Sequence, residues 1–140
     1  MSFKFERLEV WNLAIEYIDL VYEISEKLPR SEEYNLKSQM KRATTSVALN
    51  IAEGSTGQTD AEQARFLGLA LRSLLETVAC QHLISRREYL VDKGPLRQAY
   101  VQANTLAAKI QAMRNTIAPQ KKWIREESAL YEIDQTDPDH

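Results

Sequence analysis

The feature that most constrains this 140-residue chain is the spacing of its apolar residues, which recur every three or four positions in four separate stretches. This spacing places apolar side chains along one face of a helix, so each stretch predicts an amphipathic helix. The stretches run from Leu8 to Leu28, Leu36 to Ile51, Phe66 to Ile84 and Leu96 to Ile117. Nowhere do β-branched or aromatic residues alternate with polar ones over the length of a strand. The sequence therefore predicts an all-α fold.

Short breaks separate the four predicted helices. Pro29 ends the first, and Gly54 is expected to take the left-handed position that follows the second. Thr59 and Glu62 have the spacing of a capping box before the third, and Pro95 suits the first turn of the fourth. Short connections between long helices make neighbours antiparallel, so the predicted architecture is an up-down four-helix bundle.

The length and the cysteine content indicate the number of domains and the cellular location. We expect one domain at 1–125, followed by a solvated acidic tail at 126–140 that can be disordered. Cys80 is the sole cysteine, and the N-terminus lacks the apolar segment of a secretion signal. No apolar run approaches the roughly 18 residues of a membrane span. The expected location is cytoplasmic, with no membrane role.

The usual combinations of catalytic or metal-binding residues are missing from the sequence. His82 lacks the glutamate three residues before it that a di-iron bundle requires, and Cys80 has no partner at metal-ligand spacing. There is no glycine-rich phosphate loop and no nucleophile with a suitable histidine. We therefore expect a protein that is not an enzyme and uses no metal or cofactor.

Polar residues form a second stripe on the predicted second helix, beside the apolar one, and the third helix carries a matching set. Because the members are three or four residues apart, they share one helix face. The stripe consists of Gln39, Arg42, Ser46, Asn50 and Glu53, and the matching set of Arg65, Ser73 and Glu76.

Two interpretations of this stripe are open. In a hairpin whose facing residue numbers sum to about 115, Arg42 lies toward Ser73 and Glu76, and Glu53 toward Arg65. The stripe is then a ladder of interhelical hydrogen bonds and ion pairs that fixes the register of the helices. The alternative is acid/base work by Glu53 and Glu76, but this register sets them several turns apart, too far to share one substrate.

Charge is distributed unevenly. The formal net charge is −2, which argues against general affinity for nucleic acid, and residues 1–33 hold eight acids against four bases. The segment 93–125 holds seven bases and no acid. The candidate nucleic-acid-binding residues are Arg97, Lys109, Arg114, Lys121, Lys122 and Arg125. All but Lys109 fall within about a third of the helix circumference. The alternative is that the fourth helix lies against the acidic first helix.

Three segments of the sequence resemble a known family. FERLEVW at 5–11, YNLKSQMKRATTSVALNIAEG at 34–54 and RFLGLALRSLLET at 65–77 are similar to the small four-helix-bundle proteins encoded in intervening sequences of large-subunit ribosomal RNA. Relatives of that family include the accessory variability determinants of diversity-generating retroelements. The similarity extends from about Phe5 to Tyr89, and its most specific part is the segment that ends in Gly54.

The resemblance implies a non-catalytic bundle that assembles as a ring, typically a homopentamer. In retroelements, the accessory protein binds the reverse transcriptase and structured RNA through a basic surface. We therefore expect a scaffold with these two partners. This chain is less basic than such proteins, so the alternative is a structural or protein-interaction bundle without affinity for nucleic acid.

Overall fold

The structure, a computed structural model, describes residues 2–56 and 59–118. Four helices make up most of this part: α1 (Glu9–Glu26), α2 (Leu36–Gly54), α3 (Asp60–Arg86) and α4 (Gly94–Ile117). Two short 3-10 helices, η1 (Lys4–Arg7) and η2 (Arg30–Glu32), precede α1 and α2. The described residues contain no strand, which confirms the all-helical prediction and its four helices.

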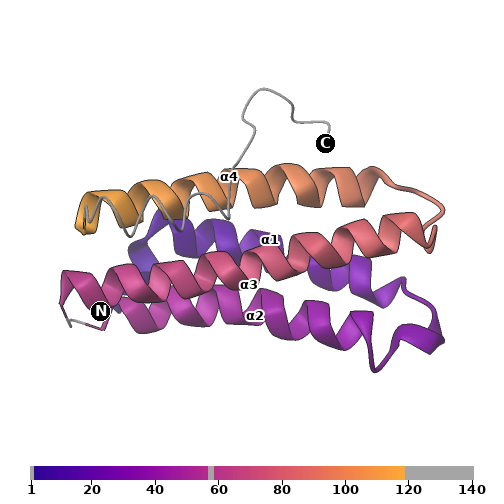
Figure 1. Ribbon diagram of the computed structural model, residues 1–140, viewed down its shortest axis with the longest axis horizontal. Helices are drawn as coiled ribbons and strands as arrows, with labels where there is room; N and C mark the ends of the chain where they lie inside the picture. Colours follow the sequence, from indigo (N-terminus) through magenta and orange to yellow (C-terminus); the bar gives the residue numbers. More distant parts are fainter. Residues whose placement is uncertain (1, 57–58, 119–140) are drawn as a thin grey trace.

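The helices run alongside one another, and successive helices point in opposite directions (Figure 1). The extensive contacts join α1 to α2, α2 to α3, α3 to α4, and α4 back to α1. Each helix therefore has two main neighbours, as in an up-down bundle.

The core is formed by the apolar stripes of the four helices. Fully buried side chains come from every helix: Tyr17, Ile24, Met40, Ile51, Leu67, Leu71, Leu74, Ile84, Leu106 and Ile110. Burying one side chain of this size stabilises a fold by about 1.5–3 kcal/mol. The apolar residues predicted to share one helix face, spaced three or four positions apart, thus form most of the core.

The start of α3 forms one of the two hydrogen bonds of the predicted capping box, while the Glu62 carboxylate pairs with Arg65. The Thr59 hydroxyl accepts a hydrogen bond from the Glu62 amide at 3.1 Å, which is the expected N-cap.

Gly54 differs from its prediction. It is the last residue of α2, and the backbone does not take a left-handed conformation there. A Cβ on Gly54 would lie 2.9 Å from Cβ of Phe66 and 3.3 Å from the carbonyl oxygen of Gln63. The glycine is needed because α2 and α3 approach closely, so the left-handed prediction was wrong.

The left-handed conformation occurs instead at the end of α3. Glu88 has φ 55°, and its amide donates to the Ser85 carbonyl at 3.1 Å. The Tyr89 amide donates to the Ile84 carbonyl at 3.4 Å, which completes a Schellman motif. This motif directs the chain across the end of the bundle to Lys93, the N-cap of α4.

Candidate functional site

A buried polar network joins α1 to α3 near the end of the bundle where α3 meets α4. The Tyr17 hydroxyl lies 2.7 Å from Oγ1 of Thr77, and Nε2 of Gln81 donates to the Tyr17 oxygen at 2.6 Å. Burial raises the pKa of Tyr17 well above its ordinary value, so the phenol stays protonated. The network is a fixed chain of neutral hydrogen bonds.

The directions of these bonds follow from the last acceptor. Thr77 donates its one proton to the Leu74 carbonyl at 2.6 Å, since a carbonyl oxygen can only accept. Tyr17 must then donate to Thr77, and its oxygen accepts from the Gln81 amide nitrogen. This order turns the Gln81 carbonyl oxygen away from Tyr17. Among the described residues, no group donates a hydrogen bond to that oxygen.

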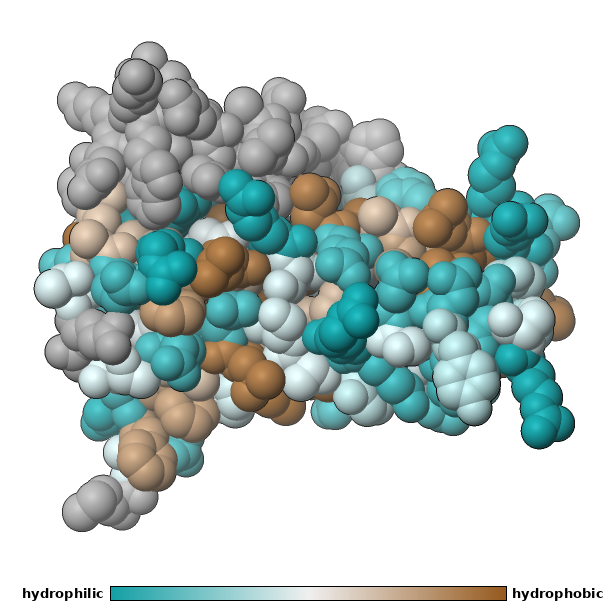
Figure 2. All heavy atoms as spheres, turned by 60° about the horizontal axis from the view of Figure 1, so that its bottom comes forward, coloured by the Kyte–Doolittle hydropathy of each residue, from teal (hydrophilic) through white to brown (hydrophobic). Residues whose placement is uncertain are grey.

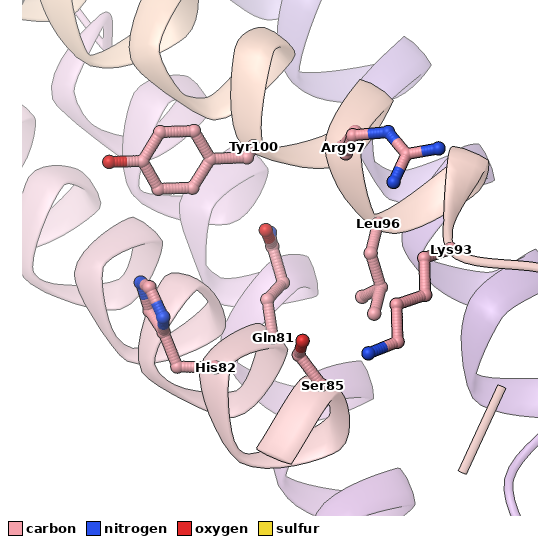
Figure 3. Close-up of a pocket in the computed structure, with 7 residues that line it drawn as sticks. All are labelled: Gln81, His82, Ser85, Lys93, Leu96, Arg97 and Tyr100. Atoms are coloured by element: carbon pink, nitrogen blue, oxygen red, sulfur yellow. The ribbon is translucent and has the colours of Figure 1, made fainter. Parts of the chain in front are cut away.

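Gln81 also lines a pocket between α3 and α4, which has a volume of about 260 Å³ (Figure 3). Gln81, His82 and Ser85 reach it from α3, and Lys93, Leu96, Arg97 and Tyr100 from the start of α4. The Lys93 side chain extends past Leu96 toward Ser85 (Figure 3). The pocket thus combines two cations, a buried amide and two rings.

The polar stripe forms one contact between helices. The Ser73 hydroxyl donates to the Ser46 hydroxyl at 2.9 Å, and the Asn50 amide nitrogen contacts the Ser46 hydroxyl and carbonyl at 3.0 and 2.9 Å. The predicted register placed Ser46 opposite Leu69. The structure places it opposite Ser73, one helical turn further along α3.

The other predicted rungs do not form within the subunit. Arg65 pairs with Glu62 on its own helix at 2.6 Å, and Gln39 donates to Asn35 at 3.0 Å. In the described part of the chain, no hydrogen bond or ion pair is found for three further residues of the stripe and its matching set, which are exposed: Arg42, Glu53 and Glu76. The structure thus contains a short serine and asparagine cluster in place of a full ladder.

Glu53 and Glu76 do not come together. Glu53 precedes Gly54, which lies against Phe66 of α3. Glu76 lies ten positions beyond Phe66 on α3, or about 15 Å at 1.5 Å per residue. This separation agrees with the sequence argument against acid/base work by this pair.

The predicted basic residues lie in different environments. Arg97 is exposed at the pocket, whereas Lys109 lies 3.3 Å from the Glu9 carboxylate of α1. The alternative that the fourth helix faces the acidic first helix therefore holds for Lys109. Lys121, Lys122, Arg125 and the tail at 126–140 lie outside the described residues.

Arg114 is buried, with 1% of its surface exposed, so its prediction as a surface residue was wrong. Its Nε donates to the Ala64 carbonyl at 3.1 Å, and its guanidinium lies against Gly68. The sequence does contain a signal for this placement, since Arg114 follows the core residue Ile110 by four positions and continues the apolar stripe.

The pocket was missed at the sequence level. Lys93 belonged to the basic segment but was not singled out, and Gln81 was not among the candidate residues. The useful signal was the position of Gln81 on the core face of α3, four residues after the buried Thr77. A glutamine at such a position needs hydrogen-bond partners.

A second surface lies on the outer face shared by α2 and α3. We define this outer α2–α3 surface by Arg42, Ser46, Leu49 and Glu53 of α2 and by Leu69, Ser73 and Glu76 of α3. Leu49 is 61% exposed. Figure 2 shows apolar side chains set singly among hydrophilic ones on one face of the molecule.

A groove of about 520 Å³ adjoins this surface and is lined in part by Phe3, Phe5, Leu49 and Ala52. Phe3 is 74% exposed at its edge. Large exposed apolar side chains beside a groove are typical of protein interfaces.

The described residues contain neither a candidate metal site nor a candidate membrane-spanning helix. Within 2–56 and 59–118, no group of three or more histidine, cysteine or carboxylate side chains is placed to hold a metal ion. In the same residues, no helix has the length and apolar character needed to cross a membrane.

Comparison with known proteins identifies the family. A search of curated proteins finds no match. The profile of the family described as 23S rRNA-intervening sequence protein matches residues 6–113, which include all of α1, α2 and α3 and most of α4. The chain therefore belongs to the 23S rRNA-intervening sequence protein family.

Proposed function

We propose that this chain is a non-enzymatic accessory scaffold that assembles as a ring-like homo-oligomer and binds structured RNA and a protein partner. A pentamer is the subunit number that the resemblance implies. The reverse transcriptase of a diversity-generating retroelement is the partner that it implies.

The observation that carries the proposal is that the outer α2–α3 surface exposes charges, unpaired within the described residues, around an apolar side chain. Arg42, Glu53 and Glu76 are exposed, and within the described part of the subunit they have no ion-pair partner. Leu49 exposes an apolar side chain beside them. Charges of both signs around an apolar centre suit a contact with a second copy, and a head-to-tail contact closes a ring.

The proposed binding of RNA is supported by the basic residues at the end of the bundle where α3 turns into α4. Arg86, Arg87, Lys93 and Arg97 lie at or near the α3–α4 turn, which also holds Glu88 and Asp92. Asp92 uses its carboxylate to accept from the Gly94 amide at 2.9 Å. The net charge of one such end is small, but a ring repeats it in every subunit, and repeated weak contacts to a polyanion reinforce one another.

Self-association is tested by light scattering of the full chain and of Leu49→Asp. The proposal expects a defined oligomer that Leu49→Asp reduces to smaller species. Val91→Asp is the matched control, because Val91 is fully exposed in the α3–α4 turn and away from this surface. A monomeric wild-type chain, or equal effects of the two variants, contradicts self-association through this surface.

RNA binding is tested by filter retention of a structured RNA at low salt. The double variant Arg86→Gln and Arg87→Gln should lower retention and flatten its salt dependence. Lys109→Gln removes one cation that is already paired with Glu9, so it should have a smaller effect. Equal retention by the wild type and the double variant contradicts the role of the basic end. The protein partner is tested by co-purification with a reverse transcriptase encoded beside the gene.

A second candidate is a protein-interaction bundle without affinity for nucleic acid. The net charge of −2 and the pairing of Lys109 with Glu9 favour it. It predicts the same oligomer but no RNA retention at low salt by the wild type.

A further inference from the structure

The pocket between α3 and α4 contains an acceptor that the fold does not use. Gln81 is only 4% exposed, and its amide nitrogen is committed to Tyr17. In the hydrogen bonds of the structure, Thr77 donates to the Leu74 carbonyl and Gln81 donates to Tyr17, so the Gln81 carbonyl oxygen faces away from Tyr17. No described residue donates to that oxygen. A buried acceptor of this kind favours a ligand that brings a hydrogen-bond donor.

The groups around Gln81 differ on its two sides. Lys93 and Arg97 lie on one side of the pocket, and the rings of His82 and Tyr100 lie on the other (Figure 3). The two ring centroids are 6.0 Å apart, with an angle of 84° between the ring planes. The first side suits an anion and the second suits a planar group, with the Gln81 acceptor between them.

We propose that this pocket binds a nucleoside phosphate. Lys93 and Arg97 bind the phosphate, the base lies against Tyr100 and His82, and an N–H of the base or a hydroxyl of the ribose donates to the Gln81 carbonyl oxygen. The pocket volume of about 260 Å³ corresponds to roughly nine water molecules at about 30 Å³ each, so part of the ligand stays in solvent. The pocket opens to solvent beside the exposed side chains of His82 and Arg97.

Binding of a nucleoside phosphate would specify how the chain contacts RNA in the proposed function. Only the assignment of the ligand to an RNA chain rests on that proposed function. A free nucleotide and the phosphorylated end of an RNA chain present the same chemistry. The pocket cations, Lys93 and Arg97, differ from the residues varied in the RNA-retention test, Arg86 and Arg87. Failure of one proposal is therefore distinguishable from failure of the other.

The first test is calorimetric titration of the full chain with AMP, with adenosine and with inorganic phosphate. We expect AMP to bind at least tenfold more tightly than either part, because only AMP contacts both sides of the pocket. Equal affinity for AMP and phosphate, or no heat of binding with AMP at millimolar concentration, overturns the proposal.

The second test uses variants. Lys93→Gln and Arg97→Gln should each weaken AMP about tenfold, which is about 1.4 kcal/mol, without changing the binding of adenosine. Arg86→Gln is the matched control, since Arg86 is an exposed cation near the same end but does not line the pocket. An equal loss in Arg86→Gln overturns the proposal.

Gln81→Leu removes the acceptor and should weaken both AMP and adenosine. It also removes the bond to Tyr17, so it can fail to fold, in which case the two cation variants decide. Competition by oligoadenylate with and without a 5′-phosphate identifies the source. Displacement of AMP by the phosphorylated oligomer alone supports an RNA end, and displacement by neither supports a free nucleotide. Equal displacement by both oligomers overturns the assignment of the phosphate to Lys93 and Arg97.

Discussion

The guanidinium of Arg114 in α4 lies against the backbone of Gly68 in α3. A Cβ on Gly68 would lie 2.8 Å from Nη2 and 3.0 Å from Cζ of Arg114. The absence of a side chain at position 68 therefore makes room for a buried cation. The two helices are fitted to each other at this point by one glycine and one arginine.

Gly68→Ala should destabilise the fold by about 0.5–2 kcal/mol. The overlap of the new methyl group with the buried Arg114 guanidinium costs about 1–3 kcal/mol, and alanine recovers roughly 0.5–1 kcal/mol of that relative to glycine inside a helix. Urea denaturation measures the loss. The control is the same substitution in an Arg114→Met background, where the overlap is relieved and the cost of the alanine should fall. If Gly68→Ala costs the same unfolding free energy in the wild type and in Arg114→Met, the contact between Gly68 and Arg114 does not limit the size of the residue at position 68.

Glu88 supplies a second stability prediction. It occupies the left-handed position of the Schellman motif at the end of α3, with φ 55°. A glycine adopts this conformation without steric cost, so Glu88→Gly should stabilise the protein by about 1 kcal/mol. Arg87→Gly is the matched control, because Arg87 has φ −77° and should gain nothing. A thermal midpoint that falls in Glu88→Gly would contradict the assignment.

Tyr17 tests the buried network. Tyr17→Phe removes the acceptor of the Gln81 amide nitrogen and the donor to Thr77, so it should cost about 1–3 kcal/mol of unfolding free energy. Tyr22→Phe is the control, since the Tyr22 hydroxyl is 3.3 Å from Thr45 at an exposed site. Equal losses in urea denaturation would indicate that the network contributes nothing specific.

The number of helices and most helix ends could be predicted from the sequence because their signals are local. Proline at position 29, the Thr59 cap and the apolar spacing act within a few residues of the chain. Gly54 has the same local signature as a helix stop. Its actual constraint is the distance to Phe66, which depends on how α2 and α3 pack and is invisible in the local sequence.

The candidate site was less predictable for the same reason. Arg97 and Arg114 fall in one broad sector of a helical wheel, yet one is exposed and the other buried, because the boundary of the core crosses that sector. The register of α2 on α3 was displaced by one turn at Ser46. Gln81 became informative only when the bonds of Tyr17 and Thr77 had fixed the orientation of its amide.

The hydrogen bond between Tyr89 and Glu32 gives a prediction about pH. The Tyr89 hydroxyl donates to the Glu32 carboxylate at 2.6 Å and ties η2 to the α3–α4 turn. This bond, with a second from Asn35, lowers the pKa of Glu32 below its ordinary value. A lowered pKa in the folded state means that the stabilisation is present above the unfolded pKa of about 4.3 and is lost as pH falls through the folded pKa.

Tyr89→Phe should therefore lower the thermal midpoint at neutral pH, and the difference from the wild type should shrink as pH falls below about 4. Thermal unfolding followed by circular dichroism from neutral to acid pH measures this difference. The acid sensitivity that remains in Tyr89→Phe includes that of Glu26, whose pKa is lowered by Lys41 and Lys37. A difference between the two proteins that stays constant across this range would show that Glu32 is not the group that titrates.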